Sequence, residues 1–545
     1  MSLKLPRLWC ALWLVLVINA AASVRAAPTD GASLARFEAA GVRIHEVRIL
    51  NRNIFDIGNP AEDKLLFRWA NALHARTRAG VIERILLFKA GEPLSARLIE
   101  ESERLLRGTG FLQDVEMRVL PVREGLVDVE VLTRDTWTLE PGLALGRSGG
   151  ENSRSISLRE YNLAGTGIQL GIGRSTDVDR SASDFQLAGD RLFGSELAGS
   201  LVLSSNSDGE RRGLRLAKPF RALDSRWAAG VAVSRDDRID SVYNAGEVSS
   251  QYRHHENLAE AYVGWSDGLV DGWVRRYTVG VGAREDAFGL EPGKAPPARL
   301  PGDETLVAPF VRVDLIEDRF EKTSNLSQIG RPEFLAMGLA ASLQLGQALR
   351  SLGSTSDPLL YQASLSRGFE PMPRHRLLTL ASVSGRLLDG QVDRQRASAR
   401  AQYFLPQPDR WLFYAGVSLD AITRPGAADT LLLGGDNGLR GYPLRYQAGT
   451  RRVLLTLEER YYTDQFWWQL LRVGGAVFAD LGRAWGGDNI NRANPGWLGN
   501  VGVGLRLFNV RSAFISVIHL DMALPINPDP GMSRVQFLIH TRASF

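Results

Sequence analysis

The residues best placed to interact chemically are charged and lie in the last quarter of the chain. Arg440 ends a glycine-rich run and precedes Gly441, a residue type that lets the backbone turn sharply. Glu458 and Asp480 lie in later alternating segments, and the alternation places Asp480 on the face opposite Val477. A guanidinium away from water needs an anionic partner, so we predict an Arg440–Asp480 ion pair that Glu458 could share. The alternative is that Asp480 belongs to a turn and Arg440 is solvated.

The sequence gives little support for catalysis. His254 and His255 are interpreted as part of a polar loop, and His and Cys residues do not have the spacing of metal ligands. We therefore expect no enzyme, cofactor or metal, although an enzyme using carboxylates and hydroxyls inside a barrel is left open by motifs alone. The 65 Lys and Arg residues nearly balance 61 Asp and Glu and form no dense basic block, so we expect no nucleic-acid partner.

The first residues have the pattern of an export signal. A basic start, an apolar run over 8–22 and small residues ending at Ala26 indicate a signal peptide over 1–26. The alternative is an uncleaved helical anchor. Cys10, the single cysteine, lies inside this signal, so we expect no disulfide. A linker over 27–42 is expected to follow, and no later apolar stretch has the length of a membrane-spanning helix.

Residues 43–135 have the pattern of a small α/β domain. A strand is predicted over 45–50, and a second helix begins after Ser95, a good N-cap residue. Two strands, 115–120 and 126–132, close the domain. Between the first strand and that helix, four apolar residues recur at helical spacing: Leu65, Leu66, Trp69 and Leu73. An edge strand of such a domain can accept another chain as an added strand.

From residue 136 to 545 apolar and polar residues alternate in many short segments. One example is the face shared by Trp227, Ala229, Val231 and Val233. Such strands could form a soluble sandwich, but so many in succession favour one closed sheet with its apolar face in lipid. A strand with its connection takes roughly 20–25 residues, so we predict a transmembrane antiparallel β-barrel of about sixteen strands. The mean hydropathy of −0.12 suits a barrel that shows lipid only every second residue.

Aromatic residues mark two further places in the predicted barrel. Trp467 and Trp468 suit an aromatic girdle at a membrane interface, the alternative being a stack in a soluble core. Phe537 lies on the apolar face of the last predicted strand, and the chain ends in Phe545. A final strand that ends in an aromatic residue looks like the C-terminal signal by which outer-membrane barrels are recognised for insertion.

Two parts of the chain resemble known families. Residues 88–95 followed by 104–111 resemble a POTRA domain, the polypeptide-transport-associated module, with an unrelated α+β domain as the alternative. The run 433–443, the strand with Glu458 and the segment 477–485 together resemble the barrel of the BamA and TamA superfamily, the bacterial surface antigen barrel. In that superfamily an Arg-Gly-Tyr tip folds back inside the barrel. The residues that match this lumenal tip are Leu439, Arg440, Gly441 and Tyr442.

The resemblance implies a function without covalent chemistry. It implies an outer-membrane protein of a Gram-negative bacterium that assists insertion, assembly or translocation of other proteins, with its POTRA domain in the periplasm. The implied partners are unfolded outer-membrane or secreted client proteins, outer-membrane lipid, and periplasmic proteins at the POTRA edge. The alternatives are a passive pore, a structural barrel, or a secretion transporter dedicated to one client.

Overall fold

The computed structural model describes residues 31–148, 151–177, 179–244, 247–426, 429–435, 437–487, 496–513 and 516–543. The predicted signal peptide and Phe545 lie outside these residues. Within them, no helix is both long and apolar enough to cross a bilayer.

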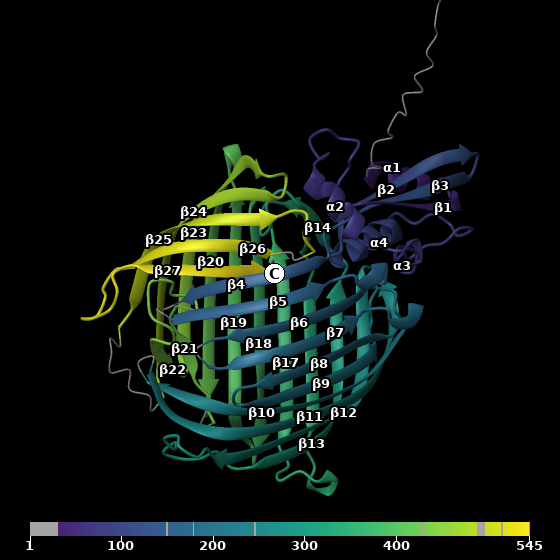
Figure 1. Ribbon diagram of the computed structural model, residues 1–545. Helices are drawn as coiled ribbons and strands as arrows, with labels where there is room; N and C mark the ends of the chain where they lie inside the picture. The colour runs from purple at the N-terminus through teal and green to yellow at the C-terminus, as the bar shows by residue number, and fades with distance from the viewer. Residues whose placement is uncertain are drawn as a thin grey trace, which may run out of the picture.

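A small α/β domain precedes a large barrel-shaped sheet (Figure 1). Its three-stranded sheet has the order β1-β3-β2, with β1 parallel and β2 antiparallel to β3. Its elements are α1 (Gly31–Ala39), β1 (Arg43–Arg52), α2 (Leu65–Leu73), α3 (Ala79–Glu83), α4 (Ala96–Gly108), β2 (Leu112–Arg123) and β3 (Leu126–Asp135). Helices α3 and α4 pack on the sheet because α4 buries Ile99 and Leu106 against it. Ser95 occupies the N-cap position of α4, but its side chain makes no capping hydrogen bond.

Helix α1 departs from the sequence interpretation. It occupies most of the segment 27–42 that was expected to be a linker, and Leu34 of α1 is buried in the core of the small domain. Phe37, one turn further along, also packs against this core, so only two apolar residues anchor the helix, and the short segment showed little amphipathic pattern in the sequence. The folded domain therefore begins earlier than residue 43.

The second part of the chain forms one antiparallel sheet whose strand order returns to its start. Its strands before the first long hairpin insertion are β4 (Leu139–Ser148), β5 (Glu151–Glu160), β6 (Ile168–Thr176), β7 (Ser181–Gly189), β8 (Ala198–Asn206), β9 (Gly209–Lys218), β10 (Trp227–Asn244), β11 (Glu247–Val270), β12 (Trp273–Leu290) and β13 (Glu304–Glu317). The remaining strands are β16 (Ala340–Gln347), β17 (Leu359–Phe369), β18 (Arg376–Leu388), β19 (Gln391–Pro406), β20 (Trp411–Thr423), β23 (Arg451–Trp467), β24 (Leu471–Trp485), β25 (Leu498–Asn509), β26 (Ser516–Pro525) and β27 (Gln536–Ala543). Two hairpins lie outside this ring, β14 (Phe320–Ser324) with β15 (Pro332–Ala336) and β21 (Leu431–Leu433) with β22 (Gln447–Gly449).

The described residues place 20 strands in the ring, so the prediction of about sixteen was wrong. The prediction allotted every strand and its connection roughly the same length. Strands β4 to β9, however, have only nine or ten residues each and are joined by short turns. Six strands therefore fit between Leu139 and Lys218, where fewer were expected.

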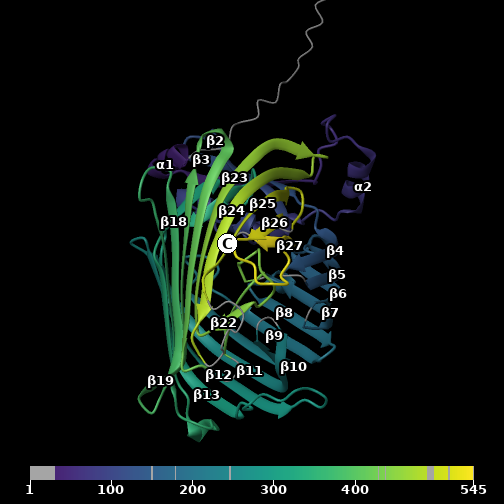
Figure 2. The same ribbon diagram turned by 90° about the vertical axis from the view of Figure 1, so that its left-hand side faces the viewer.

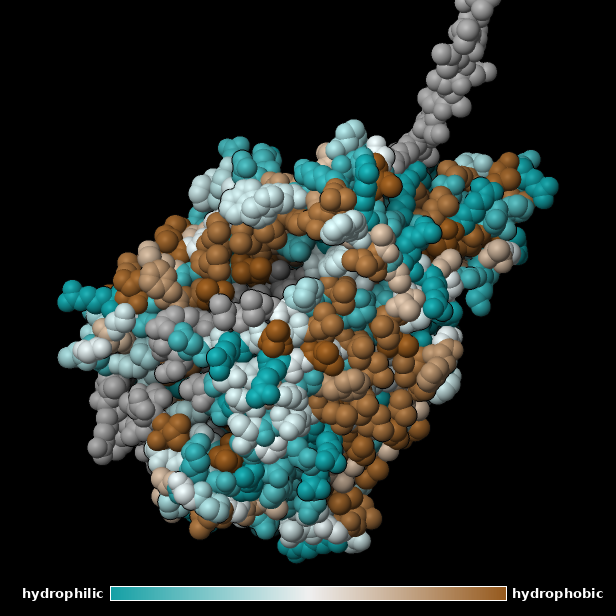
Figure 3. Space-filling view, in the orientation of Figure 1, coloured by the Kyte–Doolittle hydropathy of each residue, from teal (hydrophilic) through white to brown (hydrophobic). Residues whose placement is uncertain are grey.

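The predicted alternation is visible in the burial of the strands. Residues that face outward include Val231, Val233, Val279, Val281, Val501 and Val503, all exposed. Figure 3 shows a broad apolar area on the outer wall near β6 to β9. An exposed apolar belt of this size is what a barrel wall in contact with lipid requires.

His254 and His255 lie in strand β11 and not in the polar loop that the sequence suggested. His254 is buried between Asp240 and Asp286, with ring nitrogens 2.8 and 2.9 Å from their carboxylate oxygens. Its ring also stacks on Phe288. The pattern misled because inward-facing strand positions in this barrel carry charged residues, which in isolation resemble a loop.

Candidate functional site

The connection between β20 and β23 folds back inside the ring (Figure 2). Arg440 in this connection is 1% exposed. Its Nε and one Nη each donate to a carboxylate oxygen of Asp480 on β24, both at 2.8 Å, in a bidentate pair. The other Nη lies 2.8 Å from Oε1 of Glu458 on β23 and 3.2 Å from Oδ2 of Asp521 on β26. The structure thus brings together the three residues singled out from the sequence and adds a third carboxylate.

The charges around Arg440 are balanced. Arg460 donates to Glu458 at 2.8 Å, and Arg506 donates to Asp521. Three guanidinium groups therefore share three carboxylates. The guanidinium groups belong to Arg440, Arg460 and Arg506, and the carboxylates to Glu458, Asp480 and Asp521. Phe478 closes the remaining side, with its ring centroid 3.3 Å from the guanidinium carbon of Arg440. Burying so many ionised groups is tolerable only because each is paired.

The residues beside Arg440 fit closely against the barrel wall. Leu439 and Tyr442 are fully buried, and the Tyr442 hydroxyl donates to the carbonyl of Gly499 at 3.1 Å. The backbone N–H of Gly441 donates to Oδ1 of Asn500 at 3.1 Å. A Cβ atom on Gly441 would lie 2.6 Å from the Asn500 Cβ atom, so glycine is needed for close approach. Gly441 does not have a positive φ angle, so the sharp turn expected from the sequence is not its role.

The same connection also reaches the opposite wall. Arg445 pairs with Asp179 in the turn between β6 and β7, at 2.7 Å, and its guanidinium lies over the ring of Tyr243. Tyr446 contacts Asp529 in the turn between β26 and β27. We call residues 431–449 the inner loop. It is tied to both sides of the ring at the end away from the small domain.

The end of the barrel nearer the small domain holds a second folded segment. The β14–β15 hairpin buries Leu326 and Ile329 in a cluster with barrel residues that include Phe404, Tyr462 and Phe508. Glu333 accepts the backbone N–H groups of the 326–328 turn, which fixes its shape. The hairpin therefore fills part of the lumen at this end.

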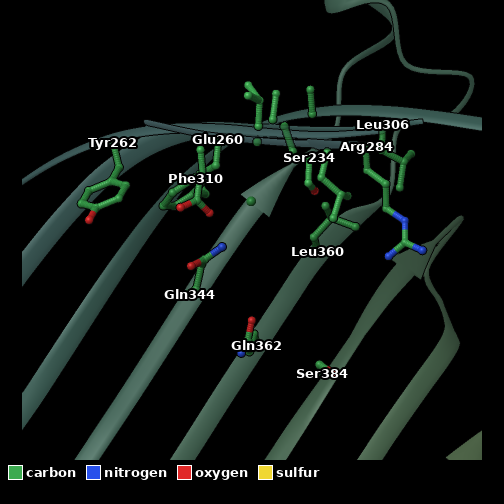
Figure 4. A pocket seen from close by; sticks show the side chains of 18 of the residues that line it. Ser234, Glu260, Tyr262, Arg284, Leu306, Phe310, Gln344, Leu360, Gln362 and Ser384 are labelled. Carbon is green, nitrogen blue, oxygen red and sulfur yellow. The ribbon is translucent and has the colours of Figure 1, made fainter. Parts of the chain in front are cut away.

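A lumenal cavity of about 1000 Å³ lies along the wall formed by β8 to β13 and β16 to β19. Figure 4 shows Tyr262, Gln344, Gln362, Arg284 and other side chains of β10 to β18 around it. The lining mixes polar and charged side chains with apolar ones in about equal measure. The β14–β15 hairpin and the inner loop each fill part of the lumen near one end of the ring.

The junction between β27 and β4 is paired far less than its neighbours. Strand β4 pairs with β5 from Leu139 to Ser148, and β26 pairs with β27 along 516–523. Across the junction, the described residues contain a single pair, Ile539 with Arg147. We call this junction the seam. Among the described residues, this junction has fewer paired residues than any other junction between neighbouring strands of the ring.

At the end near the small domain, other contacts hold the seam together. The backbone N–H of Trp137, just before β4, donates to the carbonyl of Arg511 in the β25–β26 turn at 2.6 Å. Arg511 in turn pairs with Glu62 of the small domain at 2.6 Å. On the other side, Thr77 of the small domain accepts a hydrogen bond from Asn162, beside the β5–β6 turn, at 2.7 Å. The small domain therefore bridges the two sides of the seam.

Several contributors to this site gave no readable signal in the sequence. Asp521, Arg506 and Asn500 meet Arg440 or its partners only because four strands lie side by side with a particular register. The C-terminal pattern was readable in part. Phe537 is exposed on the outer face, as its alternation predicts, whereas the side chains from His540 to the end are not described.

Comparisons with known proteins give structural matches only. The chain matches no family model, and no curated protein matches it in sequence. It is similar in structure to CdiB from Escherichia coli (13% identity, 92% of this chain and 76% of that chain, TM-score 0.47) and to CdiB from Acinetobacter baumannii (11%, 92% and 74%, 0.45). It is also similar to BamA from Haemophilus ducreyi lacking POTRA domains 1–3 (13%, 92% and 84%, 0.38).

Proposed function

We propose that this protein lies in the outer membrane of a Gram-negative bacterium and assists the insertion or translocation of other proteins there. The observation that carries the proposal is the seam, where the described residues of β27 and β4 share one pair. A strand edge with free N–H and C=O groups can pair with an added strand of a client chain. In lipid such groups cannot be left unpaired, so a client strand that fills the edge is stabilised.

The rest of the structure supports the same function. The small domain, which we interpret as a POTRA domain, bridges the seam and presents β1 and β2 as sheet edges near it. The inner loop holds β23 to β26 together through Arg440, so this part of the ring can stay folded while the seam opens. No covalent step is needed, because folding of the client supplies the driving force.

A passive pore is the competing proposal, and the two segments inside the lumen argue against it. A pore needs a wide continuous aqueous path, whereas the β14–β15 hairpin and the inner loop each fill part of the lumen near one end. Translocation of a client through the lumen would require both segments to move. Opening at the seam would not, which favours insertion over secretion.

The test compares native outer membranes that contain the wild-type chain, no chain, or the Arg440→Ala variant. Gel electrophoresis of unheated samples shows first what fraction of the variant has folded, and client levels are compared per folded barrel. We expect deletion to lower the amount of particular folded outer-membrane proteins, and Arg440→Ala to lower the same ones. Unchanged levels of all other outer-membrane proteins, with altered uptake of small solutes, would contradict the proposal and support a pore.

A further inference from the structure

Helix α2 has its apolar face pointing away from the protein. Leu65, Leu66, Trp69 and Leu73 are between 62% and 79% exposed, whereas Phe67 on the other face is 3% exposed. At 3.6 residues per turn, the four exposed residues lie within about 100° of one another. A soluble domain normally turns such a face inward, so this one needs a partner.

The position of α2 indicates what that partner is. Phe67 stacks on Phe55 with ring centroids 4.0 Å apart, and this cluster packs against Trp137 and Leu470 of the barrel. Leu470 belongs to the β23–β24 turn, at the end of the barrel nearer the small domain. Figure 2 shows α2 beyond the barrel wall, next to the start of β4 and not over the lumen. The helix therefore lies at the rim, where the apolar wall ends.

The neighbouring turn carries the aromatic residues that were expected at a membrane interface. Trp468 is 69% exposed and Trp467 is 39% exposed, and Leu470 beside them contacts the α2 cluster. Exposed tryptophans at a barrel rim indicate the level of the lipid headgroups. The apolar face of α2 continues this aromatic rim.

The charged residues near α2 also suit the level of the lipid headgroups. Three basic residues are exposed on or beside the helix: Lys64, Arg68 and Arg76. The acidic Asp63 lies beside them and pairs with Arg68. A helix with an apolar face and flanking basic residues is typical of segments that lie in the headgroup region of a phospholipid leaflet.

The helix is also held in place, by contacts within the small domain and by one ion pair to the barrel. Asn71 exchanges hydrogen bonds with the backbone of Phe55, at 2.8 and 3.1 Å, and Glu62 just before α2 pairs with Arg511 of the β25–β26 turn. The apolar face is thus fixed in place beside the seam and does not depend on a flexible tether.

We propose that α2 is an interfacial helix whose Leu65, Leu66, Trp69 and Leu73 insert into the phospholipid leaflet on the small-domain side, next to the seam. This inference rests on the proposed membrane location of the barrel, but it does not require a client protein. A lipid-inserted helix here would disturb the leaflet where a client strand is proposed to enter.

The test places a fluorescent label at single cysteines in the full chain, reconstituted in vesicles of phosphatidylethanolamine and phosphatidylglycerol that contain lipids with a quencher in the upper acyl chain. The labelled variants are Leu73→Cys for α2, Trp468→Cys for the barrel rim, and Glu124→Cys for the exposed β2–β3 turn. We expect lipid-borne quenching of the label at 73 to match that at 468 and to exceed clearly that at 124. A label on a helix that lies within about 10 Å of the boundary between headgroups and acyl chains should be quenched by such a lipid.

Two outcomes would overturn the inference. A water-soluble quencher is added in a parallel measurement. If the lipid-borne quencher acts on the label at 468, while the water-soluble quencher reaches the labels at 73 and 124 equally, α2 does not touch lipid. If the label at 73 becomes protected only when an unfolded outer-membrane protein is added, its partner is a client chain. An additional Val503→Cys label on the apolar wall tests the membrane location itself. If lipid-borne quenching is absent at 503 as well, the barrel does not lie in the bilayer, and both proposals are wrong.

Discussion

Two regions of the same barrel are held together in opposite ways. Strands β23 to β26 are joined by long ladders and by the buried ion cluster around Arg440. Across the seam, the described residues share one pair, supported by the small domain at one end. The comparison teaches that stabilising contacts are concentrated beside the seam, where we propose that the ring opens. A barrel can keep its shape during opening if the neighbouring strands are fixed independently of the seam.

The largest effect is expected from Asp480→Ala, which breaks the fixed half of the comparison. The substitution removes the bidentate partner of a buried guanidinium, which costs about 3–5 kcal/mol of folding free energy when the other partner stays buried. We expect the barrel to lose heat resistance and to unfold in less urea. Glu210→Gln is the matched control, since its exposed pair with Arg212 should contribute about 0–1 kcal/mol. Equal stability of the two variants would show that the cluster does not hold the loop.

A smaller effect is expected from Arg511→Ala, which tests the small-domain contact at the seam. Arg511 donates to Glu62 at 2.6 Å and to the carbonyl of Ile54 at 3.1 Å. Loss of charged hydrogen bonds of this kind costs about 1.5–3 kcal/mol, so we expect the small domain to be digested faster in limited proteolysis. Lys322→Ala, which removes an ion pair between the half-exposed Lys322 and Glu103, should change digestion little. If the Lys322→Ala variant is digested as fast as the Arg511→Ala variant, this interpretation is wrong.

Gly441→Ala should have an intermediate to small effect on the inner loop. The added methyl group would lie 2.6 Å from the Asn500 Cβ atom, and overpacking of this kind costs about 1–3 kcal/mol. We expect a lower unfolding midpoint with the slope unchanged. Gly302→Ala is the control, since a Cβ atom there would meet nothing within 4 Å. If both glycine variants unfold alike, close approach is not the reason for glycine at 441.

The smallest expected effect concerns pH at the contact between α4 and the β9–β10 turn. Burial raises the pKa of Glu101, which accepts the backbone N–H of Leu223 at 2.8 Å and lies near Arg97 and Arg104. A raised pKa means that this group favours docking below its ordinary pKa and that the contribution is lost as pH rises through the raised value. Mild acid should therefore slow proteolysis of the wild-type domain slightly, and Glu101→Gln should remove that dependence. An unchanged pH dependence in the variant would contradict this cause.

Some of this site was predictable because strand alternation is a strong local signal. The period of two placed Asp480 opposite Val477, and the glycine-rich run marked the loop that carries Arg440. Asp521 and the seam were not predictable, because they depend on register between strands far apart in sequence. Helix α2 shows a third case. Its apolar spacing predicted a helix, but spacing alone does not say whether a face turns toward a core or toward lipid.

The central claim, that the seam must open for function, is tested most directly by locking it. Arg147→Cys with Ile539→Cys places two cysteines at directly opposed positions, and the predicted mature chain has no other thiol because Cys10 lies in the signal. Val503→Cys with Met522→Cys makes the equivalent lock across the fully paired β25–β26 junction. We expect oxidation of the seam pair to lower the levels of the client outer-membrane proteins, reductant to restore them, and the control lock to change nothing. Full client assembly with the seam quantitatively cross-linked would contradict the account.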